Sequence, residues 1–135
     1  MIGVQLARQL KTAGLAWKPG PGDRFAIPDR DLDEEVFVLS NMTIEVHTMP
    51  EGQVIGFNGT TEWALDDVEF DETIWLPRED QLRELLGGTF RALRRPLPGY
   101  AVDIELLGEE LTFSGETAEQ AYAAALLHLL TAITR

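Results

Sequence analysis

Carboxylates are the side chains of this sequence best placed to do chemistry, and most of them lie in one segment. Residues 29–72 contain thirteen acidic residues and one basic residue, Arg30, so the segment has a charge of 1 − 13 = −12. The whole chain also has a formal net charge of −12, so the flanking residues cancel one another. A segment of one sign attracts cationic partners and repels phosphate polyanions. We therefore expect a basic protein surface as the partner and no nucleic acid.

Two acidic runs and a tryptophan form the predicted binding site. The first run follows Pro28 and the second follows Leu65. Because an indole ring attracts a cation that lies over its face, Trp63, beside Glu62 and Asp66, could line a pocket for a cationic ligand. The other interpretation of Trp63 is an aromatic residue of the core. The predicted binding residues are Asp31, Asp33, Glu34, Glu35, Trp63, Asp66 and Asp67.

The acids of residues 29–35 alternate like those of a calcium loop, but the other ligands are missing. An EF-hand needs a glycine after its third acid and a bidentate glutamate at its end. Here Glu34 follows the third acid, and Ser40 stands where the last ligand belongs. We therefore expect neither a resident metal nor a cofactor, and weak divalent-ion binding is an alternative.

A second possible site centres on a histidine. Glu45 and His47 are two residues apart in a predicted strand, so they share one face and the carboxylate could orient the imidazole. Acids among residues 66–72 could act as an acid/base pair if the fold buries them together. The alternative function is a small-ligand-binding protein or carboxylate-based enzyme with a pocket near Trp63, Glu45 and His47. The other interpretation of Glu45 and His47 is an exposed polar pair.

Residue types needed for other chemistries are missing or badly placed. The chain has no cysteine, which excludes disulfides and thiolate metal sites. His47 and His128 lack the close spacing of a zinc-binding pair, and neither serine lies in a nucleophile elbow. Arg8 and Lys11 interrupt any apolar leader, and no segment has the length of a membrane span. We expect a cytoplasmic, non-catalytic protein with no membrane partner.

The acidic segment must be positioned by strands. Runs rich in β-branched and aromatic residues predict strands at 24–27, 36–39, 43–47 and 53–57. Ser40-Asn41 separates the second and third of these, so we expect those two strands to pair. Asn58-Gly59 favours a tight turn, which predicts that residues 60–65 return against the fourth strand. A helix over residues 61–68 is the alternative.

Helices are predicted near both ends and in the middle of the chain. Apolar spacing indicates a first helix over residues 3–13 that ends at Gly14. The middle helix follows Pro77, and its expected buried face is Leu82, Leu85 and Leu86. Three further strands are predicted at 90–93, 100–106 and 111–113, with a turn at Gly108. Thr117 and Gln120 have capping-box spacing at the start of the last helix.

The last helix is apolar nearly all round over residues 122–130. It is therefore either sandwiched between layers or shared with a second subunit, which makes a homo-oligomer possible through this helix. The expected fold is a single α+β domain over residues 1–135, with a mainly antiparallel sheet packed by the N-terminal, middle and C-terminal helices. It combines the acidic, strand-rich segment 29–72 with a helix, three strands and a helix over 77–133.

Several stretches of the chain resemble those of a small actinobacterial family. They are Asp29-Arg30-Asp31, residues 36–40, residues 55–65 and residues 75–87. Members of the family often carry a pilus assembly label, which implies a tie to the ATPase of tight-adherence pili. The chain has no phosphate-binding loop of its own. The resemblance implies no catalytic residue.

The order of elements over residues 77–133 is similar to that of double-stranded-RNA-binding domains and of an antitoxin partner in a small toxin family. Residues 115–121 carry the likeness. RNA binders present lysines to phosphate at the start of this helix, whereas this chain has Glu116 and Glu119. The charge reversal argues against RNA, and an antitoxin-like partner protein is a further alternative. The leading expectation is a small acidic cytoplasmic adaptor or regulator that binds a basic protein surface.

Overall fold

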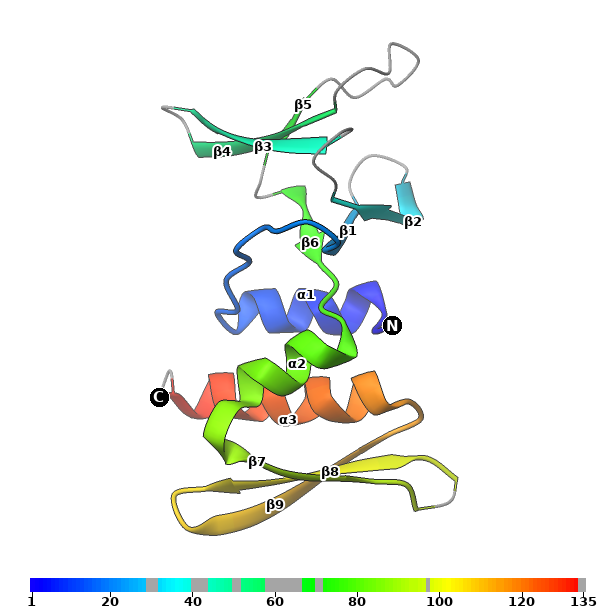
Figure 1. Ribbon diagram of the computed structural model, residues 1–135, viewed down its shortest axis with the longest axis vertical. Coiled ribbons are helices and arrows are strands. Elements are labelled where there is room, and N and C mark those ends of the chain that lie inside the picture. The colour runs from blue at the N-terminus through cyan, green and yellow to red at the C-terminus, as the bar shows by residue number, and fades with distance from the viewer. Residues whose placement is uncertain are drawn as a thin grey trace. The chain divides into compact units, whose positions relative to one another are not determined.

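The computed structural model describes residues 1–28, 32–39, 44–49, 52–57, 67–69, 72–96 and 98–133. For residues 32–35, 44–49, 52–57, 67–69 and 133 the description is of the backbone. The chain forms two compact units, which are described separately. The helical unit is Met1–Ala16 with Pro77–Arg135, and the strand unit is Trp17–Leu76. Three α-helices with antiparallel strands confirm the α+β class (Figure 1).

Helix α1 (Val4–Thr12) ends as the sequence predicts. Gly14 has a φ of 110°, and its N–H donates to the carbonyl of Lys11 at 3.0 Å. The N–H of Leu15 donates to the carbonyl of Leu10, also at 3.0 Å. This pair of bonds is a Schellman motif, which satisfies the last carbonyls of the helix and requires positive φ at the glycine.

Helix α2 (Glu79–Leu86) begins after Arg78, whose N–H donates to the side chain of Gln81 at 2.9 Å. Leu82 and Leu86 are buried, as predicted, but Leu85 is 40% exposed and the prediction for it was wrong. Successive residues lie about 100° apart around a helix, so Leu85 lies to one side of the stripe that Leu82 and Leu86 define. Gly87, with a φ of 57°, ends α2 and begins the short helix η3 (Gly87–Thr89).

The sheet of the helical unit has the order β7-β8-β9, with antiparallel pairs between β7 (Phe90–Arg94), β8 (Tyr100–Leu106) and β9 (Glu109–Gly115). Leu106 pairs with Glu109, so Leu107 and Gly108 form a two-residue turn. Their φ values of 53° and 80° suit such a turn, because positive φ at both positions matches the twist of the strands.

Helix α3 (Ala118–Ile133) is sandwiched between layers, which was one of the two predicted alternatives. It contacts β8 and β9 on one side and α1 and α2 on the other (Figure 1). Tyr122, Ala125 and Leu126 are buried there. At its start, Thr117 Oγ1 accepts the N–H of Gln120 at 3.2 Å, which confirms the predicted cap.

In the strand unit, one sheet has the order β2-β1-β6: β2 (Leu32–Val38), β1 (Arg24–Ile27) and β6 (Ile74–Trp75). The prediction that residues 36–39 pair with 43–47 was wrong, because β2 pairs with β1. Phe25 lies opposite Phe37 with ring centroids 5.5 Å apart, and both rings are buried. Burial of this aromatic pair explains why β2 pairs with β1.

A buried aspartate holds the turn that precedes β1. Asp23 is 5% exposed, and its Oδ2 accepts the indole N–H of Trp17 and the N–H of Gly20, both at 2.9 Å. Trp17 stacks on Trp75 with centroids 6.5 Å apart. A buried carboxylate must be hydrogen-bonded, so Asp23 has a structural explanation here.

The third sheet has the order β3-β4-β5: β3 (Ile44–Met49), β4 (Gly52–Phe57) and β5 (Asp67–Glu69). The predicted return strand at 60–65 and its alternative helix lie almost wholly outside the described residues, and the described strand that pairs with β4 on that side is β5. The described strands form three sheets of three strands, and every pair in them is antiparallel, which confirms the predicted antiparallel pairing.

Candidate functional site

The predicted binding residues fall into two groups. Asp31, Trp63 and Asp66 lie outside the described residues. The others lie on strands whose backbone is described: Asp33, Glu34 and Glu35 on β2, and Asp67 at the start of β5. The residues of the alternative pocket, Glu45 and His47, lie on β3.

Strand register brings four of the candidate residues to one face of the β3-β4-β5 sheet. Glu45 pairs with Gly56, which pairs with Asp67. His47 pairs with Val54, which pairs with Glu69. Residues directly opposite one another, and residues two apart on a strand, share a face. We call this set the carboxylate face: Glu45, His47, Asp67 and Glu69.

The middle strand β4 has Gly56 between Glu45 and Asp67, and Val54 between His47 and Glu69. Neighbouring strands lie about 4.8 Å apart, so the backbone positions of Glu45 and Asp67 are roughly 10 Å apart across Gly56. Glycine contributes no side chain at that position. Three acidic residues and a histidine on one face of a small sheet suit the binding of a cationic group, which is the chemistry predicted for this segment.

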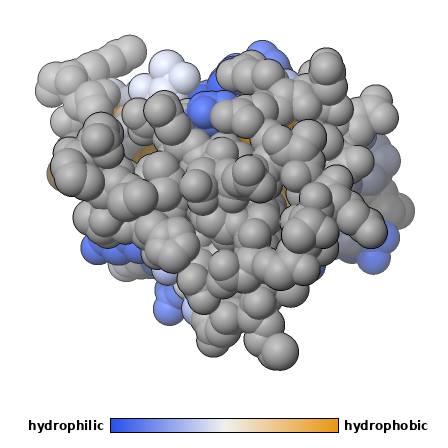
Figure 2. All heavy atoms as spheres, turned by 90° about the horizontal axis from the view of Figure 1, so that it is seen from above, coloured by the Kyte–Doolittle hydropathy of each residue, from blue (hydrophilic) through white to orange (hydrophobic). Residues whose placement is uncertain are grey.

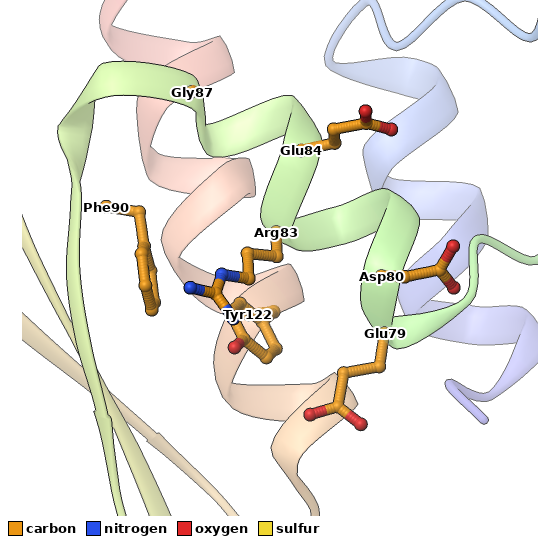
Figure 3. Close-up of a pocket in the computed structure, with 7 residues that line it drawn as sticks. All are labelled: Glu79, Asp80, Arg83, Glu84, Gly87, Phe90 and Tyr122. Carbon is orange, nitrogen blue, oxygen red and sulfur yellow. The ribbon is translucent and has the colours of Figure 1, made fainter.

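The described side chains form a second candidate site, a groove in the helical unit that sequence analysis missed. Its volume is about 840 Å³, within the range of small-molecule sites (Figure 3). It lies between α2, the start of β7 and α3. The lining residues are Glu79, Asp80, Arg83, Glu84, Gly87, Phe90 and Tyr122. The one signal in the sequence was the spacing of Glu79 and Arg83, four residues apart on one side of a helix.

An arginine and two aromatic rings form the interior of this groove. The Cζ of Arg83 lies 4.6 Å from the centroid of the Phe90 ring, and the rings of Phe90 and Tyr122 are 5.8 Å apart. Figure 3 shows the guanidinium near both rings, while the carboxylates of Asp80 and Glu84 extend away from it. Burial raises the pKa of the Tyr122 hydroxyl, the charge of Arg83 opposes this shift, and that of Glu79 adds to it.

The carboxylate of Asp80 is paired with Arg78 and not with Arg83. Its Oδ1 accepts a hydrogen bond from Nε of Arg78 at 3.1 Å. This hydrogen bond is the main reason that the pKa of Asp80 lies below its usual value. The charge of Asp80 is therefore partly compensated outside the groove, although exposed pairs of this kind are weak.

A smaller groove of about 430 Å³ lies at the end of β8 and β9. Tyr100 lines it, and the Cζ of Arg95 lies 5.2 Å from the centroid of that ring.

The described residues visible on the face drawn in Figure 2 are mainly hydrophilic.

The described residues contain no group of three or more His, Cys, Asp and Glu that could hold a metal ion. No helix in the described part of the chain combines the length and the apolar composition that crossing a membrane requires.

The chain matches no protein-family model, no curated protein and no solved structure. The resemblances to pilus-labelled, RNA-binding and antitoxin proteins stay predictions.

Proposed function

We propose that the protein is a small cytoplasmic adaptor or regulator, without catalytic activity, that binds a basic protein surface through residues 29–72. The observation that carries this proposal is the charge of the segment, thirteen acids against Arg30. Opposite charge accelerates association and selects partners, and its contribution falls as salt screens it.

The fold supports this proposal by ordering part of the acidic segment. Three of the acids lie on β2, and the acidic members of the carboxylate face lie on β3 and β5. A segment held in sheets loses less conformational entropy on binding than an unstructured one. Acidic residues on strands therefore suit a folded partner with a matching basic patch.

Charge neutralisation tests the proposal. The probe is a fluorescent lysine- and arginine-rich peptide, and the variant combines Asp31→Asn, Asp33→Asn, Asp66→Asn and Asp67→Asn. Exposed ion pairs contribute about 0.2–1 kcal/mol each, so we expect affinity to fall roughly tenfold or more. We also expect a weaker dependence of affinity on salt.

The control removes the same amount of charge from the helical unit. It combines Glu84→Gln, Glu109→Gln, Glu110→Gln and Glu116→Gln, four exposed acids outside the segment. We expect this variant to bind the peptide nearly as well as the wild type. Binding that is indifferent to salt, or equal losses in the two variants, would contradict the proposal.

A second candidate function is binding of a small cationic ligand, or carboxylate-based catalysis, at the carboxylate face. The register that places Glu45 and His47 in rows with Asp67 and Glu69 favours it. Calorimetric titration with a diamine is the test. Binding that Glu45→Gln and Asp67→Asn both weaken supports this candidate, and a titration without heat of binding rejects it.

A further inference from the structure

We propose that the groove between α2, β7 and α3 binds a zwitterionic ligand of the α-amino acid type with an aromatic side chain. Arg83 would bind the carboxylate, Glu79 the ammonium group, and Phe90 with Tyr122 the ring. The site lies in the helical unit, so this inference does not depend on the function proposed for residues 29–72.

Arg83 is held in place but keeps its hydrogen-bonding capacity. Its guanidinium lies over Phe90 at 4.6 Å, and no hydrogen bond or ion pair joins it to any other residue that the structure describes. Stacking on a ring leaves the N–H groups at the edge of the guanidinium plane, where they can bind a carboxylate with two parallel hydrogen bonds. Prior stacking also lowers the entropy cost of binding.

Tyr122 supplies a second donor. Its side chain is 1% exposed, yet it lines the groove beside Arg83 (Figure 3). No hydrogen bond joins the hydroxyl to another described residue. A phenol is protonated at neutral pH, and burial raises the pKa of Tyr122 further, so the hydroxyl is a donor. A hydroxyl that lines the groove and is not paired within the described part of the protein can donate a hydrogen bond to a ligand oxygen.

Glu79 gives the groove a negative charge, opposite to that of Arg83. It is exposed at the start of α2 and forms no ion pair with a described residue. It does not pair with Arg83, whose guanidinium is turned toward Phe90, and Figure 3 shows the two charged groups extending in different directions. Both charges act on the Tyr122 hydroxyl, so both lie near the same ring.

These opposite charges determine the class of ligand. A simple anion would be repelled by Glu79 and by the net charge of −12, and a simple cation would leave the guanidinium of Arg83 without a partner. A ligand with a carboxylate and an ammonium group satisfies both residues without adding net charge. The pair of rings between them adds a surface for an aromatic side chain, for which offset or tilted contacts are favourable.

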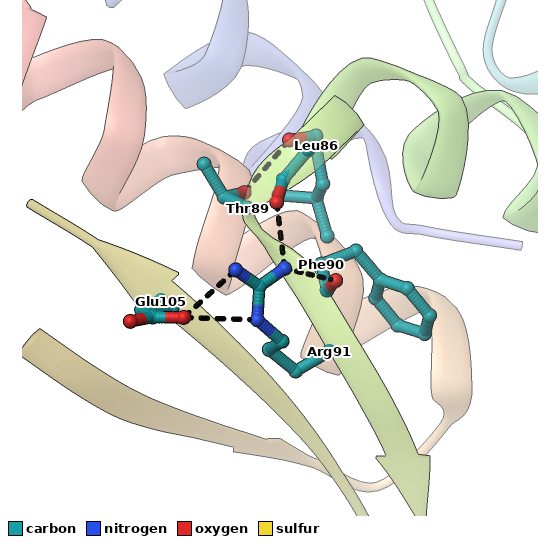
Figure 4. A network of polar contacts seen from close by, with 6 residues as sticks. Leu86, Thr89, Phe90, Arg91 and Glu105 are labelled. Atoms are coloured by element: carbon teal, nitrogen blue, oxygen red, sulfur yellow. Dashed lines mark hydrogen bonds and ion pairs between the residues drawn. The ribbon is translucent and has the colours of Figure 1, made fainter. Parts of the chain in front are cut away.

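Contacts of Arg91 hold the backbone beside the groove. Arg91 donates to Glu105 through Nε at 3.0 Å and Nη2 at 2.7 Å (Figure 4). Its Nη1 donates to the carbonyls of Gly88 and Phe90 at 2.7 and 3.1 Å. These bonds hold the backbone at Phe90, and Glu105 balances the charge of Arg91. Among the described residues that line the groove, Arg83 is the one basic residue.

The test is a two-dimensional ¹H–¹⁵N NMR titration with three probes at millimolar concentration. L-phenylalanine carries both charges, L-phenylalaninamide lacks the carboxylate, and N-acetyl-L-phenylalanine lacks the ammonium group. We expect L-phenylalanine to shift signals of α2, Phe90 and Tyr122. Each analogue should bind roughly tenfold or more weakly, because it lacks the charged group that one of the two residues binds.

Matched variants assign the charges. Arg83→Gln should weaken binding of both L-phenylalanine and N-acetyl-L-phenylalanine. Glu79→Gln should weaken binding of L-phenylalanine and strengthen that of the anionic acetylated probe, because it removes a repelling charge. Arg95→Gln is the control, because it also removes an arginine that lies over a ring, that of Tyr100. Far-UV circular dichroism checks that each variant folds.

Three results would overturn the inference: no shift with L-phenylalanine in a folded protein, equal binding of all three probes, or the same loss in Arg83→Gln and Arg95→Gln. The fourfold aspartate variant separates this site from the acidic segment. It should lose the basic peptide and still bind L-phenylalanine.

Discussion

The helical unit and the strand unit balance their charges differently. The helical unit has eight basic and nine acidic residues, a net charge of 8 − 9 = −1, whereas the strand unit has three and fourteen, a net charge of 3 − 14 = −11. In the helical unit, arginines are matched with acids on neighbouring strands, as Arg91 is with Glu105 and Arg94 with Asp103. In the strand unit, the acids outnumber any possible intramolecular partners, so their compensation must come from salt or from another molecule.

The largest expected effect concerns whether the two units unfold together. All three tryptophans lie in the strand unit, and all described α-helices lie in the helical unit. Tryptophan fluorescence and circular dichroism at helical wavelengths therefore report different units. Phe25 is completely buried, so Phe25→Ala should lower the free energy of unfolding by roughly 3–5 kcal/mol. For the predicted single domain, both signals should shift equally.

Leu126→Ala is the counterpart in the helical unit, where the side chain is 3% exposed. Leu126→Ala should lower the free energy of unfolding by about 2–5 kcal/mol, and the fluorescence and circular dichroism transitions should again shift together. The single-domain prediction would be contradicted if Leu126→Ala left the unfolding transition seen by tryptophan fluorescence unchanged, or if Phe25→Ala left the transition seen by circular dichroism unchanged. Either result would show that the two units fold independently.

A smaller effect is expected at the turn between β8 and β9. Leu107 is 97% exposed and has a φ of 53°, which is unfavourable for leucine. Leu107→Asn creates the Asn-Gly sequence that this turn prefers, so the free energy of unfolding should rise by about 0.5–1 kcal/mol. Urea denaturation measures the change. A destabilised variant would show that the leucine makes contacts in solution that outweigh its backbone strain.

The smallest expected effect is a pH dependence within the helical unit. Hydrogen bonds from Arg94 at 2.6 Å and Thr112 at 2.7 Å lower the pKa of Asp103 from 3.8 to about 2. Because the folded-state pKa is depressed, the stabilisation is present above about pH 4 and is lost as the pH falls toward 2. The pair is partly exposed, so solvent screening keeps this contribution small.

Asp103→Asn should therefore lower stability at neutral pH and flatten the decline in stability between pH 4 and 2. Urea denaturation at several pH values measures both effects. Glu105→Gln, on the same strand, is the comparison. An unchanged decline in Asp103→Asn would contradict the assignment of this pH dependence to Asp103.

Local signals in the sequence predicted much of the helical unit. Gly14 marks the end of α1, and Thr117 with Gln120 marks the start of α3, because each cap is made by residues close together in the chain. Residues 100–106 form the predicted strand β8. The prediction that Leu85 is buried was wrong, because apolar spacing along one helix does not show how much of that helix the neighbouring elements cover.

Long-range features could not be predicted in the same way. The pairing of β2 with β1 depends on Phe25 meeting Phe37, and the sequence offered a shorter hairpin as a competitor. The groove at Arg83 takes side chains from three elements, so no motif within one stretch of sequence indicates it. The carboxylate face follows from the register of β3, β4 and β5, which sequence alone does not give.

The central claim is that the acidic segment, and not the helical unit, meets the basic partner. The most direct measurement is a ¹H–¹⁵N NMR titration of the whole chain with the lysine- and arginine-rich peptide at low salt. We predict that the signals of β2 and of the β3-β4-β5 sheet shift, and that these shifts disappear at high salt. Signals moving mainly in α2 and α3, with those strands unchanged, would contradict it.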